Sequence, residues 1–320
     1  MQRLRRLRKT AILRKMVAQH QLTIDNLIFP VFVIPGKGMR KEIAALPGIY
    51  HLSADQLVEE AKKLRDLGIL AILIFGVPSH KDRLASGAYS PDGIVQKAVR
   101  ALKKNVPELV IITDVCLCEY TEHGHCGIIK DGYLLNDASL QLLAKVAVSH
   151  AQAGADIVAP AAMLDGQVRT LRTALDKHGF TDTAIMGYSV KYASKLYDPF
   201  FKSVKSAVAF GDKRTHQMDF RNSDEAMREM ALDIEEGADI VMVKPALFYL
   251  DIVQGAKSEF KMPLAVYNVS GEYAMLKAAA QNGWLDEKPA VLEMLTGFRR
   301  SGADIILTYW AQQAAKWLKE

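Results

Sequence analysis

The sequence contains no long apolar run. None of its hydrophobic stretches approaches the roughly 20 residues that an α-helix needs to cross a bilayer. The beginning of the chain is strongly basic and lacks the apolar core of a secretory signal peptide. From both absences we expect a cytoplasmic protein with no membrane partner.

Cysteine is scarce. Three cysteines occur in 320 residues, and all of them lie between positions 116 and 126. An odd number of cysteines in one short segment does not form the disulfide framework that stabilises small secreted domains. In a cytoplasmic chain such a cluster indicates a metal site or a reactive thiol.

Excess charge is small. The net charge is +5, and a composition of 50% apolar and 24% charged residues is ordinary for a soluble globular protein. Much of the excess lies in residues 1–24, which we interpret as a basic arm that contacts a neighbouring subunit; packing on the outside of its own domain is an alternative. A nucleic-acid-binding arm is the alternative. Because no aromatic residues alternate with the charges and no binding module follows, we expect no nucleic-acid partner. The charges are Arg3, Arg5, Arg6, Arg8, Lys9, Arg14 and Lys15.

A glycine-rich dinucleotide fingerprint is also absent, although strand and helix patterns alternate along the chain. About eight such pairs predict an α/β fold, a (β/α)8 TIM barrel over residues 25–320 that follows the N-terminal arm. A doubly wound sheet is the alternative. Expected strands cover residues 27–33, 70–75, 109–114, 154–160, 184–191, 238–244, 264–267 and 302–307. Expected helices cover residues 53–67, 94–104, 139–153, 167–178, 223–236, 250–260 and 290–301.

Two of the expected strands end in a lysine, Lys191 and Lys244. A lysine that reaches from a strand end into solvent is the ordinary interpretation. In a barrel, however, the chemistry lies at the carboxyl ends of the strands, where Asp114 and Tyr267 also fall. We therefore expect both amines in one pocket, where desolvation and mutual repulsion lower a pKa enough for Schiff-base formation.

The cysteines form the pattern Cys-x-Cys-x7-Cys. Three thiolates can surround one zinc ion and leave a coordination position open, as catalytic zinc sites do. His123 or His125 in the same segment would serve as a fourth ligand, or as a group that supports the ligands or faces a substrate. Free cysteines in a loop are the alternative.

These segments resemble the porphobilinogen synthase family, also called delta-aminolevulinic acid dehydratase, over essentially the whole chain. The resemblance implies a homo-oligomeric barrel enzyme, commonly an octamer, that condenses two molecules of 5-aminolevulinate to porphobilinogen with loss of two waters, a step of tetrapyrrole (heme) biosynthesis. The segments that carry it are residues 114–127, 188–194, 242–245 and 269–273.

The resemblance also implies roles for single residues. Lys191 and Lys244 match the two Schiff-base lysines, and Asp114 matches an orienting or proton-handling carboxylate. The zinc ligands match Cys116, Cys118 and Cys126, with zinc as a Lewis acid. Ser270 and Tyr309 match groups that hold the carboxylate of one substrate molecule, with Tyr267 nearby, and Gln217 matches a residue of the lid. Glu229, which by its pattern is an ordinary exposed helical glutamate, matches a residue that binds an allosteric Mg2+ in many bacterial members.

The sequence departs from the family at the lid. The family clamps the carboxylate of the other substrate with two arginines, and the matching positions here are Phe201 and Lys213. Phenylalanine has no donor, and lysine lacks the two-pronged guanidinium. Lys202 or Arg214 would compensate if the lid shifted by one residue. Ala161 and Ala162 also stand where the family has polar side chains.

Three functions fit these observations. The first is a working porphobilinogen synthase with a modified lid. The second is a paralogue in which the altered substrate site takes a different, less acidic aminoketone. The third is a non-catalytic zinc-binding homologue, which would leave the pair of lysines without a purpose. A class I aldolase-like barrel would account for a lysine but not for the cysteine segment.

Overall fold

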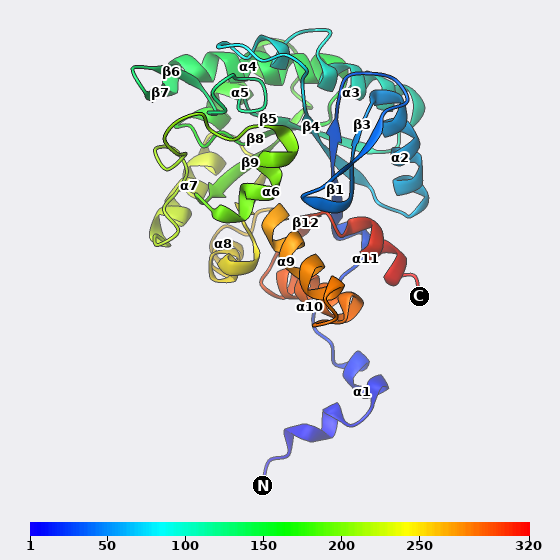
Figure 1. The fold of residues 1–320 in the computed structure, drawn as a ribbon. Helices are drawn as coiled ribbons and strands as arrows, with labels where there is room; N and C mark the ends of the chain where they lie inside the picture. The colour runs from blue at the N-terminus through cyan, green and yellow to red at the C-terminus, as the bar shows by residue number, and fades with distance from the viewer.

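Eight parallel strands close into a barrel in the computed structural model, which describes residues 1–320 (Figure 1). Each strand pairs with the next one around the ring, and β12 pairs with β1. This closing pair confirms the expected barrel and rules out an open doubly wound sheet. The strands are β1 (Leu27–Val33), β4 (Ala71–Gly76), β5 (Val110–Val115), β8 (Ile157–Pro160), β9 (Ala184–Lys191), β10 (Ile240–Lys244), β11 (Leu264–Asn268) and β12 (Ile305–Thr308).

Helices cover the outside of the barrel (Figure 1). All the expected helices are present, with ends that differ from the prediction by a few residues at most. They are α2 (Ala54–Asp66), α3 (Ile94–Asn105), α4 (Asn136–Ala153), α5 (Gln167–Lys177), α7 (Asp224–Glu235), α8 (Leu250–Phe260) and α10 (Glu287–Arg300). Elements that were not expected are the hairpins β2 (Arg40–Ile43) with β3 (Leu46–Leu52) and β6 (Ile128–Lys130) with β7 (Tyr133–Leu135), and the helices α6 (Asp198–Val204), α9 (Ser270–Gln281) and α11 (Ala311–Trp317).

The sequence Gly-Ala-Asp-Ile occurs three times, beginning at Gly154, Gly237 and Gly302. Each copy joins a helix to a strand and also ties that strand to its neighbour. Its glycine adopts a positive φ at all three positions, a conformation that costs a residue with a side chain more. Its aspartate accepts a hydrogen bond from a backbone N–H at the start of the adjacent strand. These bonds run from Ile111 to Asp156 (2.7 Å), from Ile185 to Asp239 (2.8 Å) and from Leu264 to Asp304 (2.9 Å).

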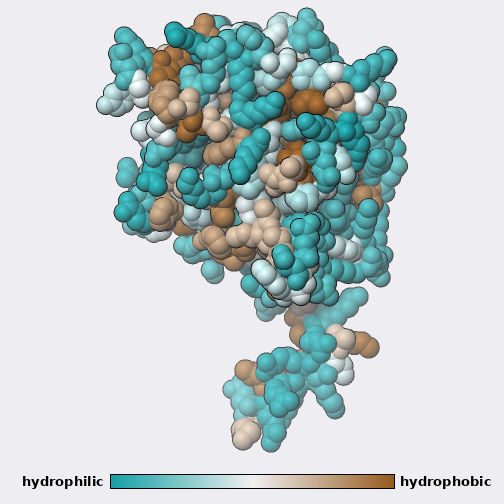
Figure 2. Space-filling model, viewed as in Figure 1, coloured by the Kyte–Doolittle hydropathy of each residue, from teal (hydrophilic) through white to brown (hydrophobic).

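The N-terminal segment leaves the barrel as a projecting arm (Figures 1 and 2). It contains a short 3-10 helix, Leu4–Arg8, and α1 (Ala11–Met16), and neither has a buried residue. Six large apolar side chains of the arm are exposed: Met1, Leu4, Leu7, Ile12, Met16 and Val17. None of the helices in the structure has both the length and the apolar character needed to cross a bilayer.

Candidate active site

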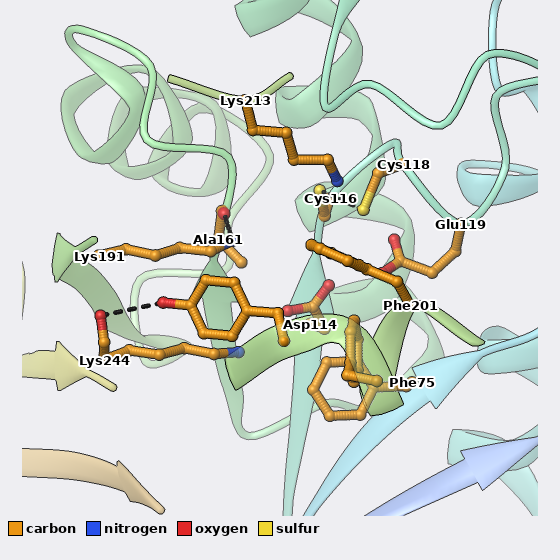
Figure 3. Close-up of a pocket in the computed structure, with 12 residues that line it drawn as sticks. Phe75, Asp114, Cys116, Cys118, Glu119, Ala161, Lys191, Phe201, Lys213 and Lys244 are labelled. Atoms are coloured by element: carbon orange, nitrogen blue, oxygen red, sulfur yellow. Dashed lines mark hydrogen bonds between the residues drawn. The ribbon is translucent and has the colours of Figure 1, made fainter. Parts of the chain in front are cut away.

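The two strand-end lysines lie side by side. Lys191 at the end of β9 is the register partner of Lys244 at the end of β10, and both line one pocket together (Figure 3). The register slips between Val241 and Val243, so β9 contains one extra residue there. This bulge changes the alternation of β9, and as a result Tyr188 and Lys191, three positions apart, both approach Lys244.

Lys244 lies in an aromatic enclosure with an exposed fraction of 6%. Its Nζ atom is 4.1 Å from the ring centroid of Tyr267 and 4.8 Å from that of Tyr188. Burial lowers the pKa of Lys244 to about 7, and the positive charge of Lys191 adds to this effect. A neutral amine, the nucleophilic form, is therefore well populated near neutral pH.

Lys191 has a different environment. Its ammonium donates a hydrogen bond to the backbone carbonyl oxygen of Ala161 (Figure 3). Ala161 lines the pocket and Ala162 is completely buried beside it. A backbone carbonyl, and not a side chain, is therefore the hydrogen-bond partner of Lys191.

Two carboxyl groups face the lysines. Asp114 at the end of β5 lines the pocket together with Glu119, and a ligand oxygen of each lies within 4.8 Å of the Cys116 sulfur. Burial, followed by the charge of Glu119, raises the pKa of Asp114 well above its usual range. Burial likewise raises the pKa of Glu119 to about 8. These acids can therefore carry protons near neutral pH and exchange them with a substrate.

The three cysteines form a buried cluster. Their sulfur atoms all lie within 4.8 Å of one another, and Cys116 Sγ is 3.3 Å from Cys118 Sγ. Hydrogen bonds from the other two thiols lower the pKa of Cys126 well below its usual range. A cluster of buried sulfur atoms with one favoured thiolate suits a thiophilic metal ion. These residues fit a metal site, as predicted from their spacing.

The histidines of this segment do not join the cluster. The ring of His125 interacts through Nε2 with the backbone carbonyl of Phe210 at 3.0 Å. His123 Nδ1 accepts a hydrogen bond from the backbone N–H of His125 at 3.1 Å. Neither ring belongs to the groups that can hold a metal. Both instead support the segment and its contact with residues 206–210.

Helix α6 and the segment after it close the pocket. Phe200 stacks edge-on against Phe75 at 4.9 Å between ring centroids, and Phe201 lines the pocket. Lys213 enters beside Cys116 and Cys118 (Figure 3) and has its Nζ 4.6 Å from the Phe201 ring. The remaining free space is about 20 Å³, enough for roughly one water molecule. A molecule larger than water does not fit this space unless α6 or the segment after it moves.

Lys213 remains charged in spite of its burial. Desolvation acts to lower the pKa of its ammonium, but the charges of Cys118, Cys126, Cys116 and Glu119 outweigh it and raise the pKa. Lys202 and Arg214, the candidates for a compensating shift, are exposed. Lys213 is thus the cation of the lid that faces the pocket. In this structure the lid is not shifted by one residue to bring Lys202 or Arg214 into its place.

The other expected substrate-binding residues lie near this pocket but do not line it. Tyr267 and Tyr309 are fully buried, with their hydroxyl oxygens 3.4 Å apart. Ser270 Oγ accepts a hydrogen bond from the Phe200 N–H at 3.0 Å and so holds α6 closed. Gln217 lines a hollow on the outer side of the lid, and its Nε2 atom has no partner.

Glu229 is not the ordinary exposed glutamate that its pattern suggested. It is half-buried on α7 and lines a hollow with Asp165 and Glu225. Burial, followed by the charge of Asp165, raises its pKa. This environment could not be predicted from the sequence, because Asp165 lies in the loop after β8, 64 residues before Glu229.

Comparisons with known proteins place this geometry in a family. A family model described as delta-aminolevulinic acid dehydratase matches residues 1–317. The chain belongs to the delta-aminolevulinic acid dehydratase family. The dehydratase from Synechocystis is 55% identical over 320 residues, covering 99% of this chain and 98% of that protein. The dehydratase from Bacillus subtilis is 52% identical over 316 residues and covers 99% of this chain and 98% of its own length.

A solved structure of the same family has the same fold. The delta-aminolevulinic acid dehydratase (porphobilinogen synthase) of Toxoplasma gondii, in complex with the reaction product porphobilinogen, aligns with a TM-score of 0.97 at 43% identity. The alignment covers 99% of this chain and 91% of that one. The barrel and the elements that close it are therefore those of a delta-aminolevulinic acid dehydratase.

Sequence reasoning missed three groups of this dehydratase site. Glu119 follows Cys118 directly and could have been noticed as a carboxylate beside the thiols. Phe200 gave no signal, because an aromatic residue in a helix is usually a core residue. Glu272 belongs to a segment that marks the family, but its burial and its partners become visible only in the structure.

Proposed function

We propose that this chain is a porphobilinogen synthase, a lyase that condenses two molecules of 5-aminolevulinate. Family membership supports this reaction. The main structural observation behind the proposal is that Lys191 and Lys244 are paired in one closed pocket. Two buried amines on adjacent strand ends suit a reaction that holds two ketones at once. The paralogue and the non-catalytic homologue are less favoured because dehydratases more than 50% identical match the chain from end to end.

Each lysine would form one Schiff base. The neutral ε-amine attacks the ketone carbon of one 5-aminolevulinate, and the resulting carbinolamine loses its hydroxyl as water to give the C=N bond. Asp114 and Glu119, with raised pKa values, would protonate that leaving hydroxyl and later accept protons from carbon or nitrogen. The aromatic rings around Lys244 exclude water and stabilise the cationic Schiff base.

We assign Cys116, Cys118 and Cys126 as the ligands of a zinc ion, because thiolates bind zinc and three protein ligands that leave a position open are typical of catalytic zinc. When bound, zinc would supply Lewis acidity to a substrate oxygen.

We assign Glu229, with Asp165 and Glu225 in the same hollow, to a regulatory Mg2+, since Mg2+ prefers carboxylate oxygens.

The N-terminal arm is assigned to contacts between copies of the chain. Residues 1–24 expose basic and apolar side chains and make no core of their own. A surface of this kind is buried in an oligomer, commonly an octamer in the family.

The activity itself is tested by porphobilinogen formation from 5-aminolevulinate by the purified, zinc-loaded protein. Turnover supports the proposal. A folded, zinc-loaded protein that gives no product would overturn it, and other aminoketones would then be tested as substrates.

The lid predicts a weakened substrate carboxylate site. We expect the double variant Phe201→Arg, Lys213→Arg to lower the KM for 5-aminolevulinate about tenfold, because a two-pronged arginine binds a desolvated carboxylate more strongly than lysine does. Steady-state kinetics of porphobilinogen formation measures this change. Lys202→Arg, on the exposed side of α6, is the matched control and should leave KM unchanged. An unchanged KM in the double variant would show that Lys213 alone already serves the carboxylate.

The pH dependence of Schiff-base formation follows from the lowered pKa of Lys244. Because only the neutral amine attacks, the rate of adduct formation at Lys244 should rise with pH around a midpoint of about 7. Borohydride trapping with 5-aminolevulinate, followed by peptide mass analysis, measures it. In Lys191→Met the midpoint should move upward, since the charge of Lys191 lowers the pKa of Lys244. A rate that is flat from about pH 6 to about pH 9 would contradict the shift.

A further inference from the structure

Glu272, in the first turn of α9, is a completely buried carboxylate with four hydrogen-bond donors around it. Oε1 accepts from the backbone N–H groups of Ala246 at 3.1 Å and Leu247 at 2.9 Å. Oε2 accepts from the side-chain amide of Asn268 at 2.7 Å and from the N–H of Val269 at 3.0 Å. Its exposed fraction is 0%.

Helix capping explains only part of this arrangement. A glutamate at the third position of a helix commonly accepts the N–H of the capping residue, here Val269. That contact involves only Oε2 and leaves the bonds of Oε1 unexplained. The bonds to Ala246 and Leu247 instead join α9 to the loop that follows Lys244. Burial disfavours the charged carboxylate, and the four donors favour it. Burial has the larger effect and raises the pKa of Glu272 to about 7.

The network continues to a third strand. Asn268 accepts a hydrogen bond from the hydroxyl of Thr308 at 2.8 Å, and that hydroxyl accepts from the N–H of Trp310 at 3.1 Å. Glu272 thereby fixes the ends of β10, β11 and β12 relative to one another. On the other side, the Lys244 carbonyl accepts a hydrogen bond from the Tyr197 hydroxyl at 3.1 Å.

We infer that Glu272 is a positioning residue for Lys244: through the amides of Ala246 and Leu247 it sets where the Lys244 amine meets the substrate ketone. The inference rests on the proposed double Schiff-base reaction. Lys191 has no direct bond to Glu272: its ammonium donates to Ala161, and its strand meets the network through the pairing with β10, where the Tyr192 N–H donates to the Lys244 carbonyl at 3.0 Å. Glu272 therefore acts directly on the segment that holds Lys244, and on Lys191 only through the pairing of β9 with β10.

Glu272→Gln tests this difference. A glutamine has one acceptor oxygen, and its NH2 group would face the donors of Asn268 and Val269 or those of Ala246 and Leu247. A reacting group displaced by about 1 Å loses up to about 100-fold in rate. We therefore expect the ratio of borohydride-trapped adduct at Lys244 to that at Lys191, with 5-aminolevulinate as probe, to fall about tenfold.

Two further variants keep the test decisive. Thr308→Val removes both outer bonds of the network, the one donated to Asn268 and the one accepted from Trp310, and should lower the same ratio about threefold. It decides the question if Glu272→Gln fails to fold. Asn268→Asp added to Glu272→Gln gives the glutamine NH2 an acceptor and should restore part of the ratio. Glu235→Gln, exposed at the end of α7, is the control and should leave the ratio unchanged.

The outcomes separate this inference from the proposed function. Equal loss of both adducts, or an unchanged ratio in the folded variants, would overturn the positioning role while leaving the Schiff-base reaction intact. If the unaltered protein formed an adduct at neither lysine, the proposed function itself would fail. A lower ratio in Glu272→Gln with partial recovery in the double variant would establish the role.

Discussion

Replacing Lys244 with methionine is expected to lower kcat for porphobilinogen formation at least about 10⁴-fold. The substitution removes the nucleophile of one Schiff base, and loss of a covalent nucleophile in other enzymes costs this much or more. Asp114, Glu119 and the cysteine cluster stay in place, but they cannot hold a ketone covalently. Adduct formation at Lys191 should persist, because the Ala161 carbonyl and not Lys244 is its hydrogen-bond partner.

The loss in Lys244→Met should be one of chemistry and not of folding. Methionine has nearly the length of lysine and suits an aromatic enclosure, and the change removes a buried ammonium that is 6% exposed. The melting temperature should therefore stay the same or rise. Lys177→Met, exposed at the end of α5, is the control with the same change in charge and should keep full activity. Activity of Lys244→Met within tenfold of the unaltered protein would contradict the role of this lysine.

The barrel was predictable because its strands are covered on both faces. Continuous apolar runs such as residues 240–243 identify buried parallel strands, and the three Gly-Ala-Asp-Ile turns fix where helices end and strands begin. Since a barrel gathers the carboxyl ends of its strands, the proximity of Lys191 and Lys244 followed from the fold alone.

What could not be predicted depends on contacts between distant segments. The bulge in β9 follows Gly187, and a glycine inside a strand is only a weak signal for a bulge, because the slip itself is a matter of register with β10. Helix α6 is short and has no amphipathic pattern of its own, so its place over the pocket is set by Phe200 packing on Phe75 and by Ser270. Gly271 at the start of α9 allows the turn before α6 to lie close against it, since a Cβ atom at Gly271 would lie 2.6 Å from the Leu196 carbonyl oxygen.

Removing the metal with a thiol-competing chelator is expected to lower turnover at least about 1,000-fold, and added zinc, but not magnesium, should restore it. The site offers two alternative sets of ligands: the three cysteines, or Asp114 with Cys116 and Glu119. Magnesium prefers oxygen ligands and would not replace a metal held by sulfur. Full turnover by metal-free protein would contradict the metal's role in the reaction.

Single variants separate the two ligand sets. Cys126→Ala breaks the sulfur set and leaves the other intact, so it should lose bound zinc, as measured by metal analysis after dialysis. Glu119→Gln is the converse change and should retain zinc, while the loss of a proton carrier with a pKa of about 8 slows turnover. If Cys126→Ala retained zinc and Glu119→Gln lost it, the metal would belong to the carboxylate set. The acids beside the lysines would then be ligands, and the protons of the condensation would have to be carried by another group of the pocket.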